Sequence, residues 1–171
     1  MKPARIADAN IVVTDEAVAE AYDESRVDFA SSRIFRSAAA PRLNIGCAWE
    51  AVSEALRPLE ERFGFICGSS NFHHLDVFNL DRLRRKLGEP VQLILVDQHM
   101  DCVRFSEEDG FLHCGNWVAF AYRRGLIAKA AMVGCRDYRK LRTFEDSLEK
   151  DGNLAYCPDP RDPLPRNFLD P

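Results

Sequence analysis

Apolar and polar residues alternate along the middle of the chain in blocks whose spacing predicts helices and strands in turn. The segment 74–87 carries apolar residues at steps of three and four, with charged residues between them, and Gly88 follows. This pattern is typical of an amphipathic helix closed by a glycine. The mostly apolar run 91–96 leads directly into Asp97, which predicts a buried strand with a polar end.

Similar patterns predict further elements on both sides of this pair. The expected strands are 10–14, 65–68 and 127–133, and the expected helices are 15–22, 47–62, 116–125 and 138–150. Asn116 is a candidate cap for the helix that begins there. Residues 23–45 show no clean period and read as a long connection or lid, and residues 157–171 read as an irregular tail rich in proline and aspartate.

The alternation of strands with helices of this length indicates the fold class. It predicts right-handed βαβ units in a single α/β domain over residues 1–171, with a mainly parallel sheet covered by helices on both faces. In such three-layer α/β/α folds, ligands bind beyond the carboxyl ends of the strands. Polar residues that follow Gly68, Val96 and Gly134 are therefore candidates for a functional site.

Composition narrows the partners that the chain can have. The 171 residues are 46% hydrophobic and 29% charged, with a net charge of −4. This charge and the lack of a long basic run argue against a nucleic-acid partner. No apolar run reaches the roughly 18–20 residues needed to cross a bilayer, and no secretory signal is evident, so we expect a cytoplasmic protein without a membrane partner. The six cysteines form no CxxC pair, which favours free thiols.

The stretch from Asp97 to Asp101 carries the strongest chemical signal. Asp97, His99 and Asp101 alternate with other residues immediately after the predicted strand. In an extended chain, alternate side chains point to one side, so two carboxylates and an imidazole would converge. This donor set suits Mn²⁺, with Fe²⁺ and Zn²⁺ as alternatives. The competing interpretation is a polar loop in which these residues cap helices.

Three further histidines follow predicted strands or precede predicted helices. His73 and His74 lie between the strand 65–68 and the helix 74–87, and either one could be a metal ligand. His113 precedes Gly115 near the start of the next helix. A histidine that borders a metal site without binding the metal can move protons near neutral pH.

Together these motifs resemble those of the ureohydrolase superfamily, which includes arginase, agmatinase and formimidoylglutamase. That family shows a Gly-Gly-Asp-His-Ser turn, then Asp-Ala-His-x-Asp, then His-Gly, then Ile-Gly-x-Arg. The related segments here are 70–74, 97–101, 113–115 and 133–137, in the same order. The resemblance covers residues 64–137 and implies an arginase-like fold. His74 precedes Asp97 by 23 residues, similar to the family spacing, which favours His74 over His73 as the first ligand.

Residue by residue, the resemblance implies a site for one or two manganese ions. His74, Asp97, His99 and Asp101 would be the ligands, with Asp97 bridging. Asp97 and His113 would be catalytic, His113 by handling protons for the leaving amine. The family's later Asp-x-Asp-x-x-Asp-Pro strand end has no clear counterpart, because the nearest acidic segments, 159–163 and 170–171, follow no convincing strand. The fold is therefore expected to be incomplete relative to the family.

The main hypothesis is a manganese-dependent hydrolase of linear C–N bonds that acts on a small guanidino or amidino substrate. The alternative is a truncated, non-catalytic ureohydrolase-like domain that binds a metal or a protein partner. An incomplete sheet would leave an exposed apolar edge, so we expect a homo-oligomer.

Overall fold

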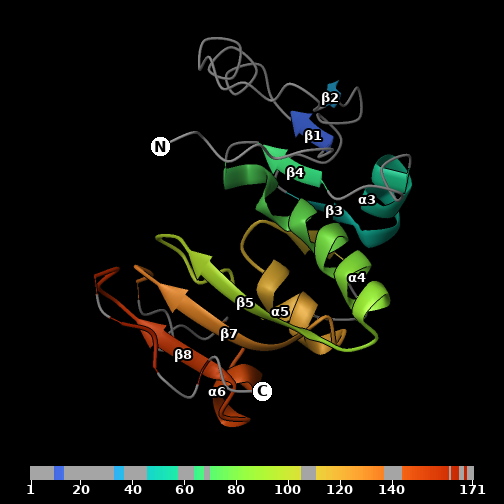
Figure 1. The fold of residues 1–171 in the computed structure, drawn as a ribbon. Helices are drawn as coiled ribbons and strands as arrows, with labels where there is room; N and C mark the ends of the chain where they lie inside the picture. The colour runs from blue at the N-terminus through green and yellow to red at the C-terminus, as the bar shows by residue number, and fades with distance from the viewer. Residues whose placement is uncertain are drawn as a thin grey trace, which may run out of the picture.

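Strands and helices alternate along most of the chain in the computed structural model (Figure 1). The structure describes residues 10–13, 33–36, 46–57, 64–67, 70–104, 111–136, 144–161, 163–165 and 168. In chain order, the elements are β1 (Asn10–Val13), β2 (Arg33–Arg36), β3 (Gly46–Ala48), α3 (Trp49–Leu56), β4 (Gly64–Cys67), the 3-10 helix η2 (Ser70–Leu75), α4 (Asp76–Leu87), β5 (Val91–Val96), β6 (Phe111–His113), α5 (Trp117–Arg123), β7 (Ile127–Val133), α6 (Ser147–Lys150) and β8 (Leu154–Cys157).

Two separate parallel sheets of three strands form the framework. Their strand orders are β2-β1-β4 and β5-β7-β8, and β3 pairs with β6 in a small antiparallel sheet. Figure 1 shows β4 beside β1 in the upper part of the molecule and β5 beside β7 in the lower part. Although α4 connects β4 to β5, these two strands lie in different sheets, so each has a free edge among the described residues.

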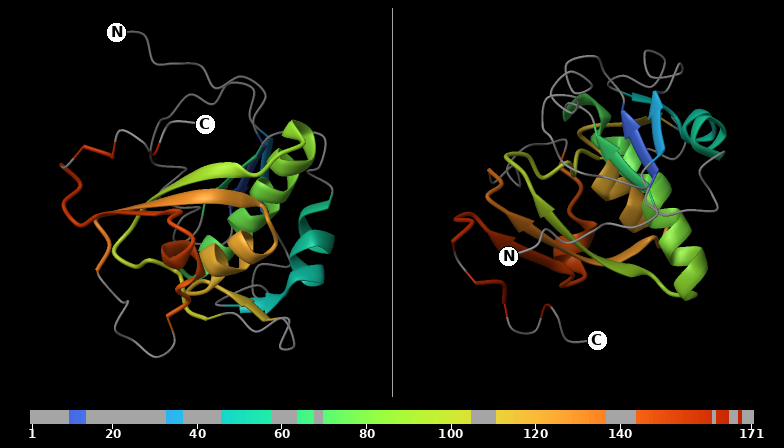
Figure 2. Two further views of the ribbon diagram at one scale, coloured as in Figure 1. Left: turned by 90° about the horizontal axis from the view of Figure 1, so that it is seen from below. Right: turned by 45° about the horizontal axis from the view of Figure 1, so that its top comes forward.

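The core lies between the β5-β7-β8 sheet and the helices that pack on it. α5 contacts α4, α6 and β7, and it lies below β5 and β7 in the left view of Figure 2. Residues 117–121 of α5 are all buried, as are most residues of the central strand β7. On the edge strand β5, Leu95 is buried whereas Ile94 and Val96 are exposed. This strand therefore has one covered face and one open face, so the prediction that 91–96 is a buried strand is wrong for one of its faces.

The strands expected at 10–14, 65–68, 91–96 and 127–133 are confirmed as β1, β4, β5 and β7, with small shifts of their ends. The helices expected around 74–87 and 116–125 are confirmed as α4 and α5. Gly88 ends α4 as predicted: its φ is 81°, and its N–H donates to the carbonyl of Arg84. Asn116 precedes α5 without a capping hydrogen bond from its side chain, so the predicted cap is wrong.

Short strands account for most of the other differences from the sequence prediction. β2 lies inside the segment 23–45, for which the sequence predicts a long connection or lid. Residues 47 and 48, the first two of the helix expected at 47–62, belong to β3 instead. β8 ends at Cys157, the residue at which the irregular tail was expected to begin. Strands of three or four residues are too short to show a period, and their pairing with distant partners decides their conformation.

Of the helix expected at 138–150, residues 138–143 lie outside the described residues, and residues 144–146 are not helical. Only α6, Ser147–Lys150, is helical among the described residues of that range, and Phe144 instead forms a bridge with Val103. The helix expected at 15–22 lies outside the described residues. No described helix is both long enough and apolar enough to cross a membrane.

Candidate metal centre

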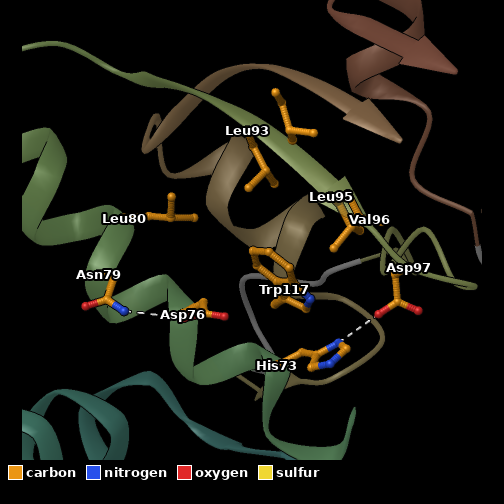
Figure 3. Close-up of a pocket in the computed structure, with 10 residues that line it drawn as sticks. His73, Asp76, Asn79, Leu80, Leu93, Leu95, Val96, Asp97 and Trp117 are labelled. Carbon is orange, nitrogen blue, oxygen red and sulfur yellow. Dashed lines mark hydrogen bonds and ion pairs between the residues drawn. The ribbon is translucent and has the colours of Figure 1, made fainter. Parts of the chain in front are cut away.

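Two strand ends bring the candidate ligands together. His73 lies on η2, which follows β4, and Asp97 follows β5 directly. Both positions are at the carboxyl ends of parallel strands, as expected for a ligand site in an α/β fold. Figure 3 shows His73 and Asp97 facing each other at one end of an open groove beside β5.

His73, Asp97 and Asp101 form the cluster. Nδ1 of His73 lies 3.1 Å from Oδ2 of Asp97 and 3.5 Å from Oδ2 of Asp101. One ligand atom from each of the three residues can be chosen so that all lie within 4.8 Å of one another. Asp101 is buried and Asp97 is partly buried, so the cluster combines restricted access with two negative groups.

The chain between the two aspartates is fixed by the end of the neighbouring strand. The N–H of Asp97 donates to the carbonyl of Val133, and the N–H of Arg136 donates to the carbonyl of Gln98. The thiol of Cys135 lies 3.1 Å from the carbonyl oxygen of His99 and donates to it. Residues 97–99 are thus held against the carboxyl end of β7 even though they lie outside the strand.

Asp101 is positioned by the start of α5. The indole Nε1 of Trp117 donates to its Oδ2 over 2.7 Å, and the N–H of Val118 donates to its carbonyl. The backbone of Asp101 has a φ of 49°, in the left-handed region that non-glycine residues seldom adopt. Such conformations persist where surrounding contacts fix them, and they are frequent at functional sites.

His99, one of the predicted ligands, does not join the cluster. The chain bends after Val96 instead of continuing as an extended strand, so the geometric reason for expecting three converging side chains is wrong. The His99 side chain is 55% exposed, with its Nδ1 3.7 Å from Oδ1 of Asp97. It therefore lies beside Asp97 on the solvent side of the cluster.

The structure places His73 where the sequence resemblance favoured His74. His74 is completely buried, and its Nε2 lies 3.8 Å from the thiol sulfur of Cys47. The cluster contains His73, the alternative that the sequence left open. The 3-10 turn explains the difference, because adjacent residues on such a turn point in different directions. The identity of the metal ligands stays a prediction.

His113 borders the cluster from the end of β6. Its Nδ1 accepts a hydrogen bond from the N–H of Gly115 over 3.1 Å, and its own N–H donates to Oδ1 of Asn116. Partial burial lowers the pKa of the His113 imidazole, and the nearby negative charge of Asp101 opposes that shift. A neutral imidazole held in this way is able to exchange a proton near neutral pH.

The electrostatics of the cluster favour a cation. A hydrogen bond with Asp101 raises the pKa of the His73 imidazole. The negative charges of Asp97, Asp101 and Asp76 raise this pKa further, whereas burial lowers it. Burial raises the pKa of Asp76 to about 6. The residues present fit a divalent ion, because two carboxylates and an imidazole converge on one volume where a cation would relieve their repulsion. Three ligand positions suit one ion.

Sequence reasoning missed the role of Trp117, because no local pattern indicated that an indole would donate to a carboxylate sixteen residues away. The acidic segment near the tail does not add to the cluster among the described residues. The Asp159 carboxylate instead accepts hydrogen bonds from the side chain of Arg161.

Comparison with known proteins supports the fold. No protein-family model matches this chain. An uncharacterized protein of Thermotoga maritima is 30% identical over 74 residues, which are 43% of this chain and 28% of that protein.

Two solved structures resemble the chain over nearly its whole length. A hypothetical agmatinase from Burkholderia thailandensis gives a TM-score of 0.57 at 16% sequence identity. The match covers 89% of this chain and 54% of the agmatinase chain. Proclavaminate amidino hydrolase from Streptomyces clavuligerus gives a TM-score of 0.55 at 14% sequence identity. This match covers 88% of the present chain and 58% of the hydrolase chain. The predicted resemblance is thus confirmed for the fold: the chain has an arginase-like α/β fold that spans about half the length of these proteins.

Proposed function

We propose that the chain binds one divalent metal ion, with Mn²⁺ as the first candidate, through His73, Asp97 and Asp101, and that it hydrolyses a C–N bond of a small guanidino or amidino compound. The observation that carries this proposal is the approach of Nδ1 of His73 to carboxylate oxygens of Asp97 and Asp101, at 3.1 and 3.5 Å. The substrate class follows from the names of the two structural neighbours, an agmatinase and an amidino hydrolase.

A bound divalent ion would supply a water molecule that loses its proton near neutral pH and can attack a planar guanidinium or amidine carbon. The chain would contribute positioning. Trp117 holds Asp101 by a hydrogen bond, and the end of β7 holds the chain that carries Asp97. Rigid ligands of this kind favour a fixed geometry of the reacting groups.

His113 is the proposed proton carrier. Because Nδ1 accepts the hydrogen bond from Gly115, the neutral ring carries its proton on Nε2. That proton is available to a leaving amine, and the ring can take a proton back from water. Its lowered pKa keeps the neutral form dominant at pH 7.

The alternative function, a non-catalytic metal-binding domain, is favoured by a different observation. The chain spans only 54% and 58% of the two structural neighbours, and one carboxylate pair with one histidine makes up the described cluster. A smaller ligand set holds an ion less tightly and can leave the substrate without a complete binding surface.

One assay separates these functions. Protein purified without chelator and resupplied with Mn²⁺ is incubated with a panel of guanidino and amidino compounds, and the release of urea or amine is measured. We expect turnover that disappears in Asp97→Ala together with the metal. In His113→Asn, we expect retained metal and a kcat lower by roughly 10²–10⁴-fold. Bound metal without turnover of any compound supports the non-catalytic alternative. A folded chain that binds no metal contradicts both proposed functions.

A further inference from the structure

The side chain of Asn116 bonds to two backbone groups of the strand that carries His113. Its Oδ1 accepts a hydrogen bond from the N–H of His113 over 2.8 Å, and its Nδ2 donates to the carbonyl oxygen of Phe111 over 2.9 Å. The backbone N–H of Asn116 also donates to the carbonyl oxygen of His113 over 3.0 Å. Three hydrogen bonds therefore tie the residue before α5 to both ends of β6.

Burial of the Asn116 side chain leaves its amide one arrangement of hydrogen bonds. The residue is only 3% exposed. A rotated amide would turn Nδ2 toward the N–H of His113 and Oδ1 toward the carbonyl oxygen of Phe111, and neither contact could be a hydrogen bond. Buried polar groups that lose their partners destabilise the fold. The amide therefore stays bound to β6, which explains why it does not cap α5.

The turn that Asn116 closes also holds the imidazole of His113. The N–H of Gly115 donates to Nδ1 of His113 over 3.1 Å, and the carbonyl oxygen of Gly115 accepts a hydrogen bond from the N–H of Val103 over 2.9 Å. A Cβ atom on Gly115 would lie 3.4 Å from Nδ1 of His113, so the backbone passes close to the ring. The orientation of the imidazole thus depends on the path of residues 113–116.

We propose that Asn116 is a positioning residue for His113. By fixing β6 and the turn that follows it, Asn116 keeps the N–H of Gly115 on Nδ1, and the neutral imidazole then carries its proton on Nε2. The next residue, Trp117, orients Asp101. The start of α5 would therefore organise both the proton carrier and one metal ligand. The functional meaning of this inference rests on the proposed role of His113, but the state of the imidazole can be measured without turnover.

Nuclear magnetic resonance of the full chain without added metal tests the positioning. The ¹⁵N chemical shifts of the imidazole nitrogens distinguish the two neutral tautomers. We expect the Nε2–H form of His113 in the wild type and a mixture of tautomers in Asn116→Ala, with faster solvent exchange of the Gly115 amide. The pKa of His113 should rise in this variant, because a hydrogen bond accepted by Nδ1 favours the neutral ring. The charge of Asp101, which raises this pKa, acts in both proteins.

Asn153→Ala is the matched control. The Asn153 side chain donates a hydrogen bond to the hydroxyl of Tyr122 over 2.9 Å, immediately before β8. This variant also removes a partly buried asparagine hydrogen bond, but not one that reaches β6. We expect its His113 signals to match those of the wild type.

Asn116→Asp decides the question if Asn116→Ala does not fold. The carboxylate has nearly the same shape and can still accept from the N–H of His113, but it cannot donate to the carbonyl oxygen of Phe111. We expect weaker protection of the Gly115 amide in this variant as well. Wild-type tautomer and wild-type Gly115 protection in the folded Asn116 variants would overturn the proposal and leave Asn116 with a role in stability only.

Kinetics separate this inference from the proposed function. If the wild type turns over a guanidino or amidino compound, Asn116→Ala should keep its metal content and KM, with a kcat lower by about 10–100-fold. An unchanged kcat would overturn the positioning role. A wild type without turnover contradicts the proposed hydrolysis, and the signals of His113 and Gly115 then decide by themselves whether Asn116 positions the ring.

Discussion

The indole Nε1 of Trp117 donates to Oδ2 of Asp101 over 2.7 Å, and the same carboxylate oxygen lies 3.5 Å from Nδ1 of His73. The first residue of α5 therefore orients a side chain of the cluster whose backbone lies in the left-handed region. This relationship makes the geometry of the cluster depend on a core tryptophan that binds no metal itself.

Replacing Trp117 with Phe should weaken metal binding while keeping most of the packing. Loss of the hydrogen bond leaves the Asp101 carboxylate free to rotate, and loss of such supporting contacts typically costs 10–100-fold in metal affinity. Titration with Mn²⁺ measures the change. Trp49→Phe is the control, because Trp49 is partly buried and its ring packs against Phe120, so its affinity should match the wild type.

The two adjacent histidines should respond differently to substitution. His73→Gln is expected to reduce metal affinity at least tenfold with little change in stability, because His73 is partly exposed and faces both carboxylates. His74→Gln is expected to keep metal affinity and lower the free energy of unfolding by about 1–3 kcal/mol, since His74 is fully buried. Metal titration and urea denaturation of both variants measure these effects. A loss of metal affinity in His74→Gln but not in His73→Gln would contradict this assignment and identify His74, which the family spacing favours, as the ligand.

Much of the fold could be predicted because long elements have a readable period. The apolar residues spaced three and four apart before Gly88 predict α4, and the apolar run before Asp97 predicts β5. The strands β2, β3, β6 and β8 were not predicted, because three or four residues carry no reliable period and their conformation depends on partners distant in sequence.

The candidate site was predicted in part. The sequence placed Asp97 and Asp101 after the right strand, but the choice between His73 and His74 depended on the direction of a 3-10 turn. The position of His99 depended on where the chain bends after Val96. Both features are set by tertiary contacts, such as the hydrogen bond from the Asp97 N–H to Val133, that no local pattern encodes.

Asp76 should make stability depend on pH. Burial raises its pKa from 3.8 to about 6, so the folded state holds a proton that the unfolded chain releases. The folded state is favoured by this group below about pH 4, and that advantage is lost as the pH rises through about 6. At pH 7.5, Asp76→Asn should raise the free energy of unfolding by about 1–3 kcal/mol.

The amide of this variant can still accept the hydrogen bond that Asn79 donates to Asp76 over 3.3 Å. The gain should therefore come from removing the charge, and it should shrink toward zero at pH 4. Urea denaturation of chelator-treated protein at both pH values measures it. A difference between the variant and the wild type that does not change with pH would show that the buried charge is not its source.

Glu145 should be sensitive to the loss of its cationic partner. It is 4% exposed, and its carboxylate accepts a hydrogen bond from Arg123 over 2.7 Å and others from Ser147. Arg123→Ala would leave a buried carboxylate without its counter-charge, at an expected cost of about 2–3 kcal/mol, somewhat below that of a fully buried pair. Thermal and chemical denaturation measure this cost.

The neighbouring Arg124 provides a matched control. It is exposed, and its guanidinium lies 5.1 Å from the centre of the Phe120 ring. An exposed cation–π contact contributes about 0.5–1 kcal/mol, so Arg124→Ala should cost less than Arg123→Ala. Equal losses in the two variants would argue against a special role for the Arg123–Glu145 pair.

The most direct measurement is the metal content per chain, determined by elemental analysis after purification without chelator, resupply of Mn²⁺ and removal of the excess. The cluster of His73, Asp97 and Asp101 predicts about one equivalent in the wild-type chain. In Asp101→Asn, with the fold intact by circular dichroism, it predicts a loss of most of that metal. A wild-type chain that is folded and takes up no Mn²⁺, Fe²⁺ or Zn²⁺ would contradict the metal centre and the hydrolase proposed from it.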